Sequence, residues 1–421
     1  MNILILGGGG REHALAWAVK QNPKCDRLIV APGNVGIAML AECADIDILD
    51  GDAVAVFAAE NAVDFVIVGP EAPLAAGVAD RLRDAGFVVF GPSAAAAQLE
   101  SSKSFTKAIC DAANAPTAAY ARFTETSAAH AYVTAQGAPI VIKADGLAAG
   151  KGVVVAMTEA EAHAAIDDML GGAFGTAGAE VVIEEFMDGE EASFFVLVDG
   201  TTILPIGTAQ DHKRAFDGDL GPNTGGMGAY SPAPVLTDAI AAQAVVRIIA
   251  PCMAEMARRG TPYQGVLYAG LMIKDGQARL VEYNARYGDP EAQVLMMRLG
   301  AQALDLMQAC AEGRLADMTV HWAEDHALCV VMAANGYPGA YAKGSEIKGL
   351  DQLPEDSSQM LFHAGTTGSG GHVFASGGRV LNVAARGVSL QQARDRAYAM
   401  VDQIDWPDGF YRKDIGWRAL S

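Results

Sequence analysis

The first hundred residues alternate short apolar runs with segments of helical periodicity. The apolar runs are NILILGG, RLIVAPG, DFVIVGP and FVVFGP, and between them lie REHALAWAVKQN, GDAVAVFAAENA and LAAGVADRLRDAG. Apolar strands that alternate with amphipathic helices form βαβ units, so this order predicts a doubly wound parallel sheet. Ligands of such sheets bind beyond the carboxyl ends of the strands. Those ends carry GGGG, APGN, VGPE and FGPS, where we expect a ligand-binding edge.

The rest of the chain has a different pattern. A length of 421 residues predicts roughly two to four domains, at about 150 residues per domain. Beyond residue 102, mixed α and β signals predict hairpins around 140–156 and 181–204, a long glycine-rich loop at 210–234 and a helix near 238–258. Two strands, GVLYAGLMIKDG and ARLVEYN, follow. The last hundred residues indicate short strands and a helix near 389–404.

Composition narrows the classes of partner. The formal net charge of −20 opposes binding to nucleic acid, although a small anionic ligand needs only a few focused cations. The six cysteines lie far apart, so we expect neither a disulfide framework nor a zinc site. The longest uncharged apolar stretch, 327–342, is interrupted by Asn, Gly and Pro, and the N-terminus lacks the pattern of a secretory signal. We expect a cytoplasmic protein without a membrane segment.

The motif GGGGREHAL does not fit a nicotinamide dinucleotide site. In a G-x-G-x-x-G register, Glu12 or His13 would occupy the third glycine position, and the second strand ends in APGN without an acid for the ribose. What remains is a glycine turn at a helix N-terminus, which favours an anion such as a monophosphate. The alternative is a tight turn that holds no ligand.

The stretch VIKADGLAAGKGVVVA, residues 141–156, resembles a phosphate loop but lacks its spacing. Gly146 and Gly150 are separated by three residues, Gly152 follows Lys151 where Ser or Thr is required, and the next residues favour a strand. The pattern therefore predicts a hairpin with a glycine loop and a lysine at each shoulder. Its glycines either approach a phosphate or simply form a surface turn.

The segment VEYNARYGDPE predicts a strand that leads into a helix. Glu282, Asn284 and Arg286 are two residues apart and would share one face of the strand. A carboxylate beside an amide oxygen is a plausible half-site for Mg²⁺, and the alternative is a solvated strand face. Asp289 is the expected N-cap of the helix, with Pro290 at its first position. Arg286 would hold either a substrate carboxylate or an acid of the scaffold.

Two further segments carry charge. In VVIEEFMDGEEASFFVLVDG, acids at a hairpin rim beside Phe and Met either receive ribose hydroxyls and an exocyclic amine or form an ordinary exposed turn. In the 210–234 loop, QDHKR places a base, an acid and cations side by side, and NTGG offers backbone N–H groups to an anion. His212 in this loop is more often structural than catalytic in such a context. No Ser/His/Asp or Cys/His grouping indicates a covalent nucleophile.

Taken together, these motifs resemble one family over essentially the whole chain. GGGGREHAL, KADGLAAGKGV, EEFMDGEEAS, AQDHKRAFDGDLGPNTGGMGAYSPAP, LYAGLMI, EYNARYGDPEAQ, FHAGT and YRKDIGWRAL follow the order and wording of the phosphoribosylamine-glycine ligases, which belong to the ATP-grasp superfamily. The resemblance implies an α/β and α+β multidomain fold. It implies an N-terminal parallel-sheet domain over 1–101, an ATP-grasp core over 102–325 with a lid at about 120–190, and a small β-rich C-terminal domain over 326–421.

The resemblance also implies an activity. The expected reaction joins glycine to 5-phosphoribosylamine through glycyl phosphate, consumes ATP, and gives glycinamide ribonucleotide, ADP and phosphate in purine biosynthesis. The implied partners are these small molecules and Mg²⁺ or Mn²⁺, with no nucleic acid or membrane, and the expected state is a monomer or weak homodimer.

The resemblance implies site residues in three groups. For ATP these are Lys103, Lys143, Gly150, Lys151, Gly152, Glu184, Glu185, Phe186, Met187 and the ribose acid Glu191, with Glu190 left open as an alternative. For the metal they are Glu282 and Asn284. For catalysis and the other substrates they are Arg286 (glycine carboxylate), Asp211 (glycine ammonium or incoming amine), Gly8, Gly9 and Gly10 (5-phosphate), and Lys213, Arg214, Asn223, Thr224 and Gly225.

Three alternatives remain at this point. Another purine-pathway ATP-grasp enzyme, a carboxylase or a formate-using transformylase, would lack the specific 210–234 loop. An NAD-dependent oxidoreductase is favoured only by the first βαβ unit. A catalytically silent nucleotide-binding scaffold is opposed by the intact residues Lys143, Glu282, Asn284 and Arg286.

Overall fold

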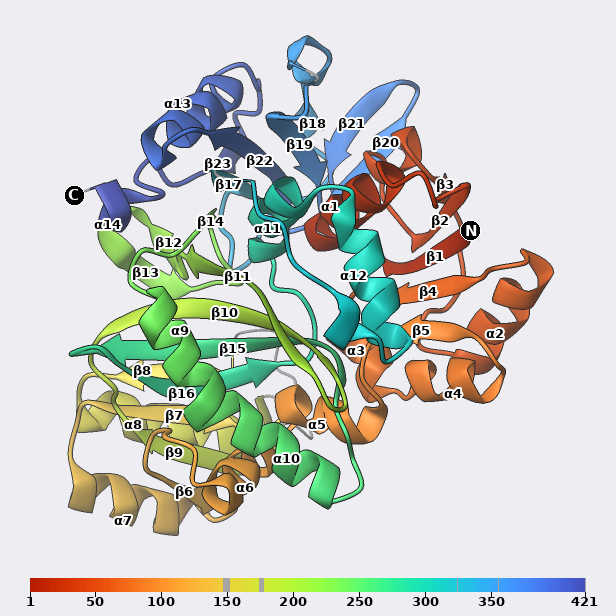
Figure 1. The fold of residues 1–421 in the computed structure, drawn as a ribbon. Coiled ribbons are helices and arrows are strands. Elements are labelled where there is room, and N and C mark those ends of the chain that lie inside the picture. The colour runs from red at the N-terminus through yellow and green to blue at the C-terminus, as the bar shows by residue number, and fades with distance from the viewer. Residues whose placement is uncertain (147–151, 174–177, 324, 355, 421) are drawn as a thin grey trace.

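The computed structural model describes residues 1–146, 152–173, 178–323, 325–354 and 356–420. They form a five-stranded sheet, a four-stranded sheet, one large sheet and two small ones. Figure 1 shows the N-terminal hundred residues at the right, the four-stranded sheet at the bottom and the C-terminal residues at the top, with the large sheet running from the middle into the C-terminal part.

The N-terminal sheet has the parallel, doubly wound arrangement that the sequence predicts. Its strand order is β3-β2-β1-β4-β5, and each neighbouring pair is parallel. The strands are β1 (Asn2–Gly7), β2 (Arg27–Pro32), β3 (Glu42–Cys43), β4 (Phe65–Val68) and β5 (Val88–Phe90). The helices are α1 (Gly10–Lys20), α2 (Gly51–Glu60), α3 (Glu71–Ala75), α4 (Val78–Asp84) and α5 (Ala94–Ser101).

Strand β1 explains why both faces of this sheet are covered. Leu4 and Leu6 pack in one apolar cluster with residues of α2 and α4, whereas Ile3 and Ile5 pack in another with residues of α1. Successive side chains of a strand point to opposite faces, so an uninterrupted apolar strand needs helices on both.

The four-stranded sheet has an apolar core of its own. Its antiparallel order is β6-β9-β7-β8, formed by β6 (Tyr120–Phe123), β7 (Ile140–Ala144), β8 (Val153–Ala156) and β9 (Val181–Glu185). The helices α7 (Thr126–Gln136) and α8 (Glu159–Asp168) supply Ala129, Val133 and Ile166 to the core. The predicted 140–156 hairpin is confirmed, because Lys143 pairs with Val153.

The hairpin predicted at 181–204 was wrong. Both strands exist, but β9 belongs to the four-stranded sheet, whereas β10 (Glu190–Asp199) pairs with β11 (Ile203–Asp211) and β15 (Gln264–Lys274) in the large sheet. Residues 186–189, which we call the crossing segment, therefore lead from one sheet to the other. The local pattern predicts strands and a turn, but pairing is decided by distant partners.

The large sheet runs through two regions of the chain. Its order is β16-β15-β10-β11-β14-β17-β22-β19, with β23 paired to β17. The remaining strands are β14 (Gly228–Ser231), β16 (Gln277–Asn284), β17 (His326–Ala334), β19 (Gln359–His363), β22 (Arg379–Gly387) and β23 (Gly409–Phe410). Since β14 pairs with β17, the C-terminal residues continue this sheet.

Smaller elements complete the fold. The 210–234 loop contains a two-stranded hairpin of β12 (Arg214–Phe216) and β13 (Leu220–Asn223). The C-terminal region adds β18 (Glu346–Ile347), β20 (Thr366–Ser369) and β21 (His372–Ala375). The helix predicted near 389–404 is α13 (Leu390–Val401), capped by Ser389, and α14 (Trp417–Leu420) follows.

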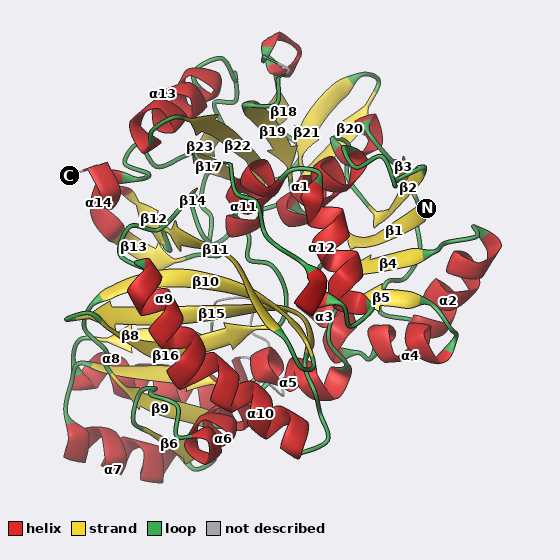
Figure 2. Ribbon diagram, in the orientation of Figure 1, coloured by secondary structure: helices red, strands yellow, loops and turns green. Residues whose placement is uncertain are grey.

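The helices of the middle region lie against the sheets (Figure 2). They are α6 (Lys103–Ala113), α9 (Asp238–Ala244), α10 (Ala250–Arg258), α11 (Glu291–Leu299) and α12 (Gln302–Ala311). The continuous helix Asp238–Arg258 is, by length and composition alone, long and apolar enough to cross a membrane. In this fold it packs against β16 and α6.

The predicted N-cap of α11 was also wrong. The N-cap position is Pro290, and no side chain caps the helix. The Asp289 carboxylate instead lies 3.3 Å from Nη2 of Arg379 and accepts a hydrogen bond of 2.8 Å from Nε2 of Gln293. An ion pair with a residue distant in sequence thus replaces the local cap.

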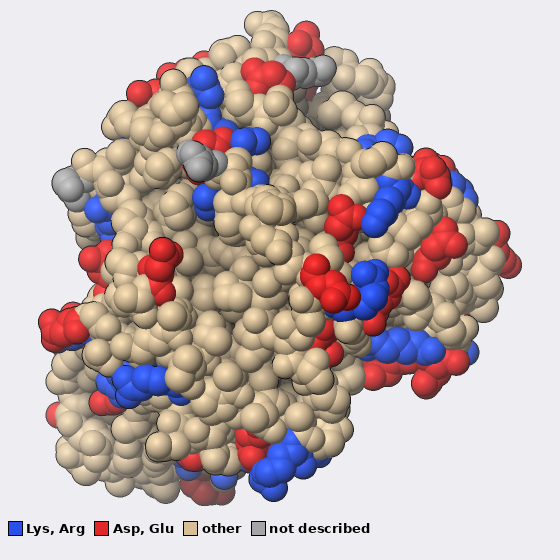
Figure 3. Space-filling model, viewed as in Figure 1, with Lys and Arg blue, Asp and Glu red and all other residues tan. Residues whose placement is uncertain are grey.

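Surface charge is mixed on the face that Figure 3 shows. Lysines and arginines there lie beside aspartates and glutamates. Because the net charge is −20, we expect an anion to bind only where a few cations are concentrated.

Candidate active site

A cleft of about 830 Å³ opens between the four-stranded sheet and the large sheet; we call it the central cleft. One wall comes from β7, β8 and β9, and the other from β10, β11, β15 and β16. It collects most of the predicted site residues, namely Lys103, Lys143, Gly152, Glu184, Glu185, Phe186, Met187, Glu191, Asp211, Lys213, Arg214, Asn223, Thr224, Gly225, Glu282, Asn284 and Arg286. Residues far apart in sequence thus share one cavity.

Some predicted residues are not in this lining. Gly8, Gly9 and Gly10 do not line the described cleft. The N–H of Gly9 donates to Glu12 Oε2 at 2.8 Å, so a side chain of the same turn already occupies it. Gly150 and Lys151 lie outside the described residues.

At the end of the cleft near the four-stranded sheet, two lysines share one carboxylate. Nζ of Lys143 lies 3.0 Å and Nζ of Lys107 lies 3.3 Å from the same Oε2 of Glu184, and all three side chains are buried. Lys107 also donates to Oγ1 of Thr117 and to the carbonyl of Ala118, at 2.9 and 3.0 Å. Burial lowers the pKa of Lys107 despite the attraction of Glu184. With both lysines protonated, the trio carries one excess positive charge.

Glu184 and Glu185 have different surroundings although they are neighbours. Consecutive side chains of a strand point to opposite faces, and β9 directs Glu184 to the lysines. Glu185 instead pairs with Arg279 of β16 and accepts a 3.0 Å hydrogen bond from the N–H of Ala119. After them, Phe186 is partly exposed and Met187 is buried.

Lys213 organises a group of acids in the middle of the cleft. Its Nζ contacts the Glu191 carboxylate and lies 3.9 Å from Oε1 of Glu282. Burial lowers the pKa of Lys213, but Glu191, Asp211 and Glu282 outweigh burial and raise it well above its usual value. Burial raises the pKa of Asp211 to about 8, against the ammonium of Lys213 and with the help of Glu291 and Glu191.

Glu282 and Asn284 on β16 present hard oxygen donors, which suit a divalent cation such as Mg²⁺. Burial raises the pKa of Glu282, but the ammonium groups of Lys213, Lys143 and Lys103 outweigh burial and hold it below its usual value. The carboxylate is therefore ionised at neutral pH, as a metal ligand must be. Oδ1 of Asn284 accepts a 3.2 Å hydrogen bond from Arg286. This donor set fits the predicted metal.

Arg286 is held by acids of the scaffold. Its guanidinium donates to Glu100 at 2.7 Å and to Glu71 at 3.3 Å. Burial lowers the pKa of Arg286, but Glu100 and Glu71 outweigh burial and raise it. Two protein carboxylates thus already occupy some of the Arg286 N–H donors that were expected to bind a substrate carboxylate.

The 210–234 loop is more ordered than its sequence suggests. His212 is fully buried, and its Nε2 accepts a 3.0 Å hydrogen bond from the N–H of Gly416, which gives it a structural role. Arg214 donates to the carbonyl of Gly221 at 2.8 Å across the hairpin. Nη1 of Arg379 donates to the carbonyls of Gly225 and Asp289, at 2.6 and 2.5 Å, and fixes the loop end at the cleft.

The sequence reasoning missed several residues of the cleft lining: Arg11, Glu71, Glu100, Lys107, Glu291, Tyr337 and Arg379. For Lys107 a signal existed, because it follows Lys103 by four residues and such residues share a helix face. Arg11 directly follows the glycines of the first motif. Tyr337 and Arg379 lie in no motif that the sequence analysis singled out, and only the fold brings them here.

Comparison with known proteins places this geometry in a family. Three family models match the chain: the N domain of phosphoribosylglycinamide synthetase over residues 1–100, its ATP-grasp (A) domain over 101–292 and its C domain over 327–418. A phosphoribosylamine–glycine ligase of Mesorhizobium japonicum is 58% identical over 421 residues, covering 100% of this chain and 99% of the relative. That of Brucella melitensis is 57% identical with the same coverage.

Solved structures agree with these matches. The phosphoribosylamine–glycine ligase of Thermotoga maritima has a TM-score of 0.86 and 29% identity, covering 99% of this chain and 100% of that chain. A biotin carboxylase of Campylobacter jejuni has a TM-score of 0.75 at 14% identity, covering 97% and 92%, which shows a shared fold only. The chain belongs to the phosphoribosylamine–glycine ligase family, whose members are ATP-grasp ligases.

Proposed function

We propose that this chain joins glycine to 5-phosphoribosylamine through glycyl phosphate and releases glycinamide ribonucleotide, ADP and phosphate. The observation that carries the proposal is the central cleft, where buried lysines and a metal-type oxygen pair face each other across two sheets. Such a site serves phosphoryl transfer, in which the protein mainly positions reactants and neutralises charge. The reaction requires no nucleophilic side chain.

ATP would lie between the two sheets. Lys103 and Lys143 would contact its phosphates, helped by the excess positive charge that Lys107 contributes beside Glu184. Glu184 to Met187 would border the adenine, Glu191 would receive the ribose, and Gly152 with Gly150 and Lys151 would cover the phosphates. Glu282 and Asn284 would hold Mg²⁺ or Mn²⁺, which when bound would neutralise charge on the β- and γ-phosphate oxygens.

The chemistry would proceed in two displacements. An oxygen of the glycine carboxylate attacks the γ-phosphorus, the bond to the bridging oxygen breaks, and ADP leaves. The amine nitrogen of 5-phosphoribosylamine then attacks the carbonyl carbon of glycyl phosphate, phosphate leaves, and the amine loses a proton. Closure of the four-stranded sheet over the cleft would keep water from the acyl phosphate.

Arg286 and Asp211 are our candidates for holding glycine. Arg286 would contact the glycine carboxylate with the remaining N–H of Nη1, since its other donors bind Glu71, Glu100, Asn284 and the carbonyl of Tyr287. Asp211 would receive the ammonium group or the incoming amine. Its pKa of about 8 in the free protein means that a bound cation must help to ionise it.

For 5-phosphoribosylamine, the loop residues Lys213, Arg214, Asn223, Thr224 and Gly225 are candidates at the cleft. Gly8, Gly9 and Gly10 stay candidates for the 5-phosphate, and binding there would displace the Glu12 carboxylate from the N–H of Gly9. We further propose that the protein acts in the cytoplasm as a monomer or weak homodimer, without nucleic acid or membrane.

The reaction is tested by measuring ADP release with ATP, Mg²⁺, glycine and freshly prepared phosphoribosylamine, leaving out one component at a time. We expect full turnover only with all four, because the acyl phosphate needs the amine for release. ADP formation at full rate without phosphoribosylamine, or with a hydroxy acid in place of glycine, would contradict the proposal.

Glu282→Gln should lower kcat by about hundredfold or more, because the amide keeps the shape but loses the charge that a divalent cation requires. Asp275→Asn is the matched control, since Asp275 lies in the turn just before β16, at the opposite end of the strand from Asn284. Thermal unfolding should be similar for both variants. Near-normal turnover of Glu282→Gln would place the metal elsewhere.

Asp211 should give glycine binding a pH dependence. Its pKa is raised to about 8 by burial, so the binding-competent anion is the minor form at lower pH. We expect kcat/KM for glycine to rise about tenfold per pH unit up to about pH 8 and then level off. In Asp211→Asn this rise should be absent and kcat/KM low throughout; a wild-type profile in the variant would exclude the role.

Lys107→Met should raise the KM for ATP by about tenfold, because Glu184 then neutralises Lys143 and the trio of Lys107, Lys143 and Glu184 loses its excess positive charge. The KM for glycine should change little. Lys107→Arg retains the charge and should recover most of the ATP affinity. An unchanged KM for ATP in Lys107→Met would show that the trio serves packing only.

A further inference from the structure

A second hollow, the outer groove, lies beside the start of β6 and the end of β9. It has a volume of about 760 Å³ and is lined by Asp111, residues 114–122, Glu185, Arg247 and Arg279. Among the described residues, Glu185 alone lines both this groove and the central cleft. The groove is therefore a separate hollow that adjoins the central cleft at Glu185 and at Lys107, which donates to the groove residues Thr117 and Ala118.

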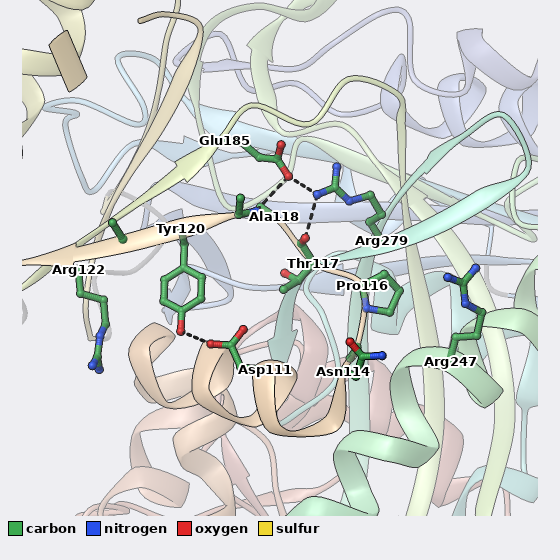
Figure 4. Close-up of a pocket in the computed structure, with 13 residues that line it drawn as sticks. Asp111, Asn114, Pro116, Thr117, Ala118, Tyr120, Arg122, Glu185, Arg247 and Arg279 are labelled. Carbon is green, nitrogen blue, oxygen red and sulfur yellow. Dashed lines mark hydrogen bonds and ion pairs between the residues drawn. The ribbon is translucent and has the colours of Figure 1, made fainter. Parts of the chain in front are cut away.

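Three arginines from three different elements surround the outer groove. Figure 4 shows Arg247 and Arg279 on one side and Arg122 on the other, beyond Tyr120. Arg247 donates at 2.8 Å to Gln277 Oε1, which is uncharged. Within the part of the chain that the structure describes, the Arg122 side chain has no hydrogen bond or ion pair.

The two acids of the groove are already engaged. Asp111 accepts a 2.7 Å hydrogen bond from the hydroxyl of Tyr120, and Glu185 pairs with Arg279. Asp111 thus has no cationic partner, and its single negative charge is smaller than the two positive charges of Arg122 and Arg247. In a chain of net charge −20, such a concentration of guanidinium groups around a hollow favours an anion.

The pairing of Arg279 and Glu185 connects the two sheets. Arg279 lies on β16 of the large sheet and also donates to the carbonyl of Thr117 at 2.8 Å. Glu185 ends β9 and accepts from the N–H of Ala119, just before β6. One guanidinium therefore ties the start of β6 and the end of β9 to the large sheet, next to the crossing segment. An anion in the groove would compete with Glu185 for this guanidinium.

We propose that the outer groove is a regulatory site for a phosphate group, carried by inorganic phosphate or by a phosphate monoester of a small metabolite. Arg247 and Arg279 bind the phosphate through charge-assisted hydrogen bonds. Binding draws Arg279 from Glu185 and loosens the four-stranded sheet from the large sheet. The volume of about 760 Å³ is that of a small-molecule site. Pro116 and the ring of Tyr120 offer an apolar surface to the rest of a monoester.

The test is equilibrium dialysis of the full chain with radiolabelled inorganic phosphate. A non-hydrolysable ATP analogue with Mg²⁺ occupies the nucleotide part of the central cleft, and any phosphate bound elsewhere in that cleft is common to wild type and the variants because Arg247 does not line it. We expect wild type to bind about one more phosphate per chain than Arg247→Ala, since loss of a guanidinium weakens phosphate binding at least about tenfold. Arg258→Ala is the matched control, because Arg258 ends the same continuous helix and is mostly exposed. Equal phosphate binding by all three proteins would overturn the proposal.

Unlabelled competitors identify the natural source of the phosphate. Displacement of the label by glycerol 3-phosphate or AMP at lower concentrations than by inorganic phosphate would identify a monoester, and equal displacement the free ion. Hydrogen exchange gives a readout that does not depend on turnover. Phosphate should speed exchange in β6 and β9 of wild type and leave Arg247→Ala unchanged; unchanged exchange in wild type would refute the link to the sheets.

Discussion

The central interaction of this structure is the buried carboxylate of Glu184, which two lysine ammonium groups share. Burying a charge without a partner is costly. Because the two lysines share one carboxylate, this end of the cleft keeps one positive charge that a phosphate can neutralise. The three residues come from β9, β7 and α6, so the interaction also holds the four-stranded sheet to the helix beside it. Nζ of Lys143 further donates to the carbonyl of Val281 on β16, at 3.3 Å.

The large sheet provides one wall of the site. Strand β16 carries Glu282 and Asn284, and its neighbour β15 pairs with β10, which carries Glu191. Because β14 and β17 extend the sheet into the C-terminal region, Arg379 at the start of β22 reaches Gly225 of the 210–234 loop at the cleft. The four-stranded sheet, which forms the opposite wall, has an apolar core of its own.

Glu184 and Glu185 show how one strand can serve two surfaces. The first faces the lysines of the central cleft, and the second pairs with Arg279 at the outer groove. The sequence shows the pair of acids but not this division. Whether a strand residue faces a cleft or the outside depends on what packs against each face, which no local pattern contains.

Much of the fold was predictable from the sequence, whereas the roles of the site residues stay predictions. The two failures in the fold have one physical cause. Apolar periodicity correctly indicated the parallel sheet and the 140–156 hairpin, since both depend on local alternation. The predictions of the second hairpin and of the Asp289 cap failed because the residues have distant partners: β10 pairs with β15, and Asp289 forms an ion pair with Arg379. Lys107 had a weak signal in its spacing from Lys103, whereas Tyr337 and Arg379 had none.

The sequence by itself determined which chemical groups are present, the motifs that resemble one family, and the strands on which Glu282, Asn284 and Lys143 lie. Only the tertiary structure decided which of these groups meet and what charge each carries. It gave Lys143 a shared carboxylate, tied Arg286 to Glu71 and Glu100, and raised the pKa of Asp211 to about 8. The reason is that residue identity sets the possible charge, whereas burial and distant neighbours set its energy.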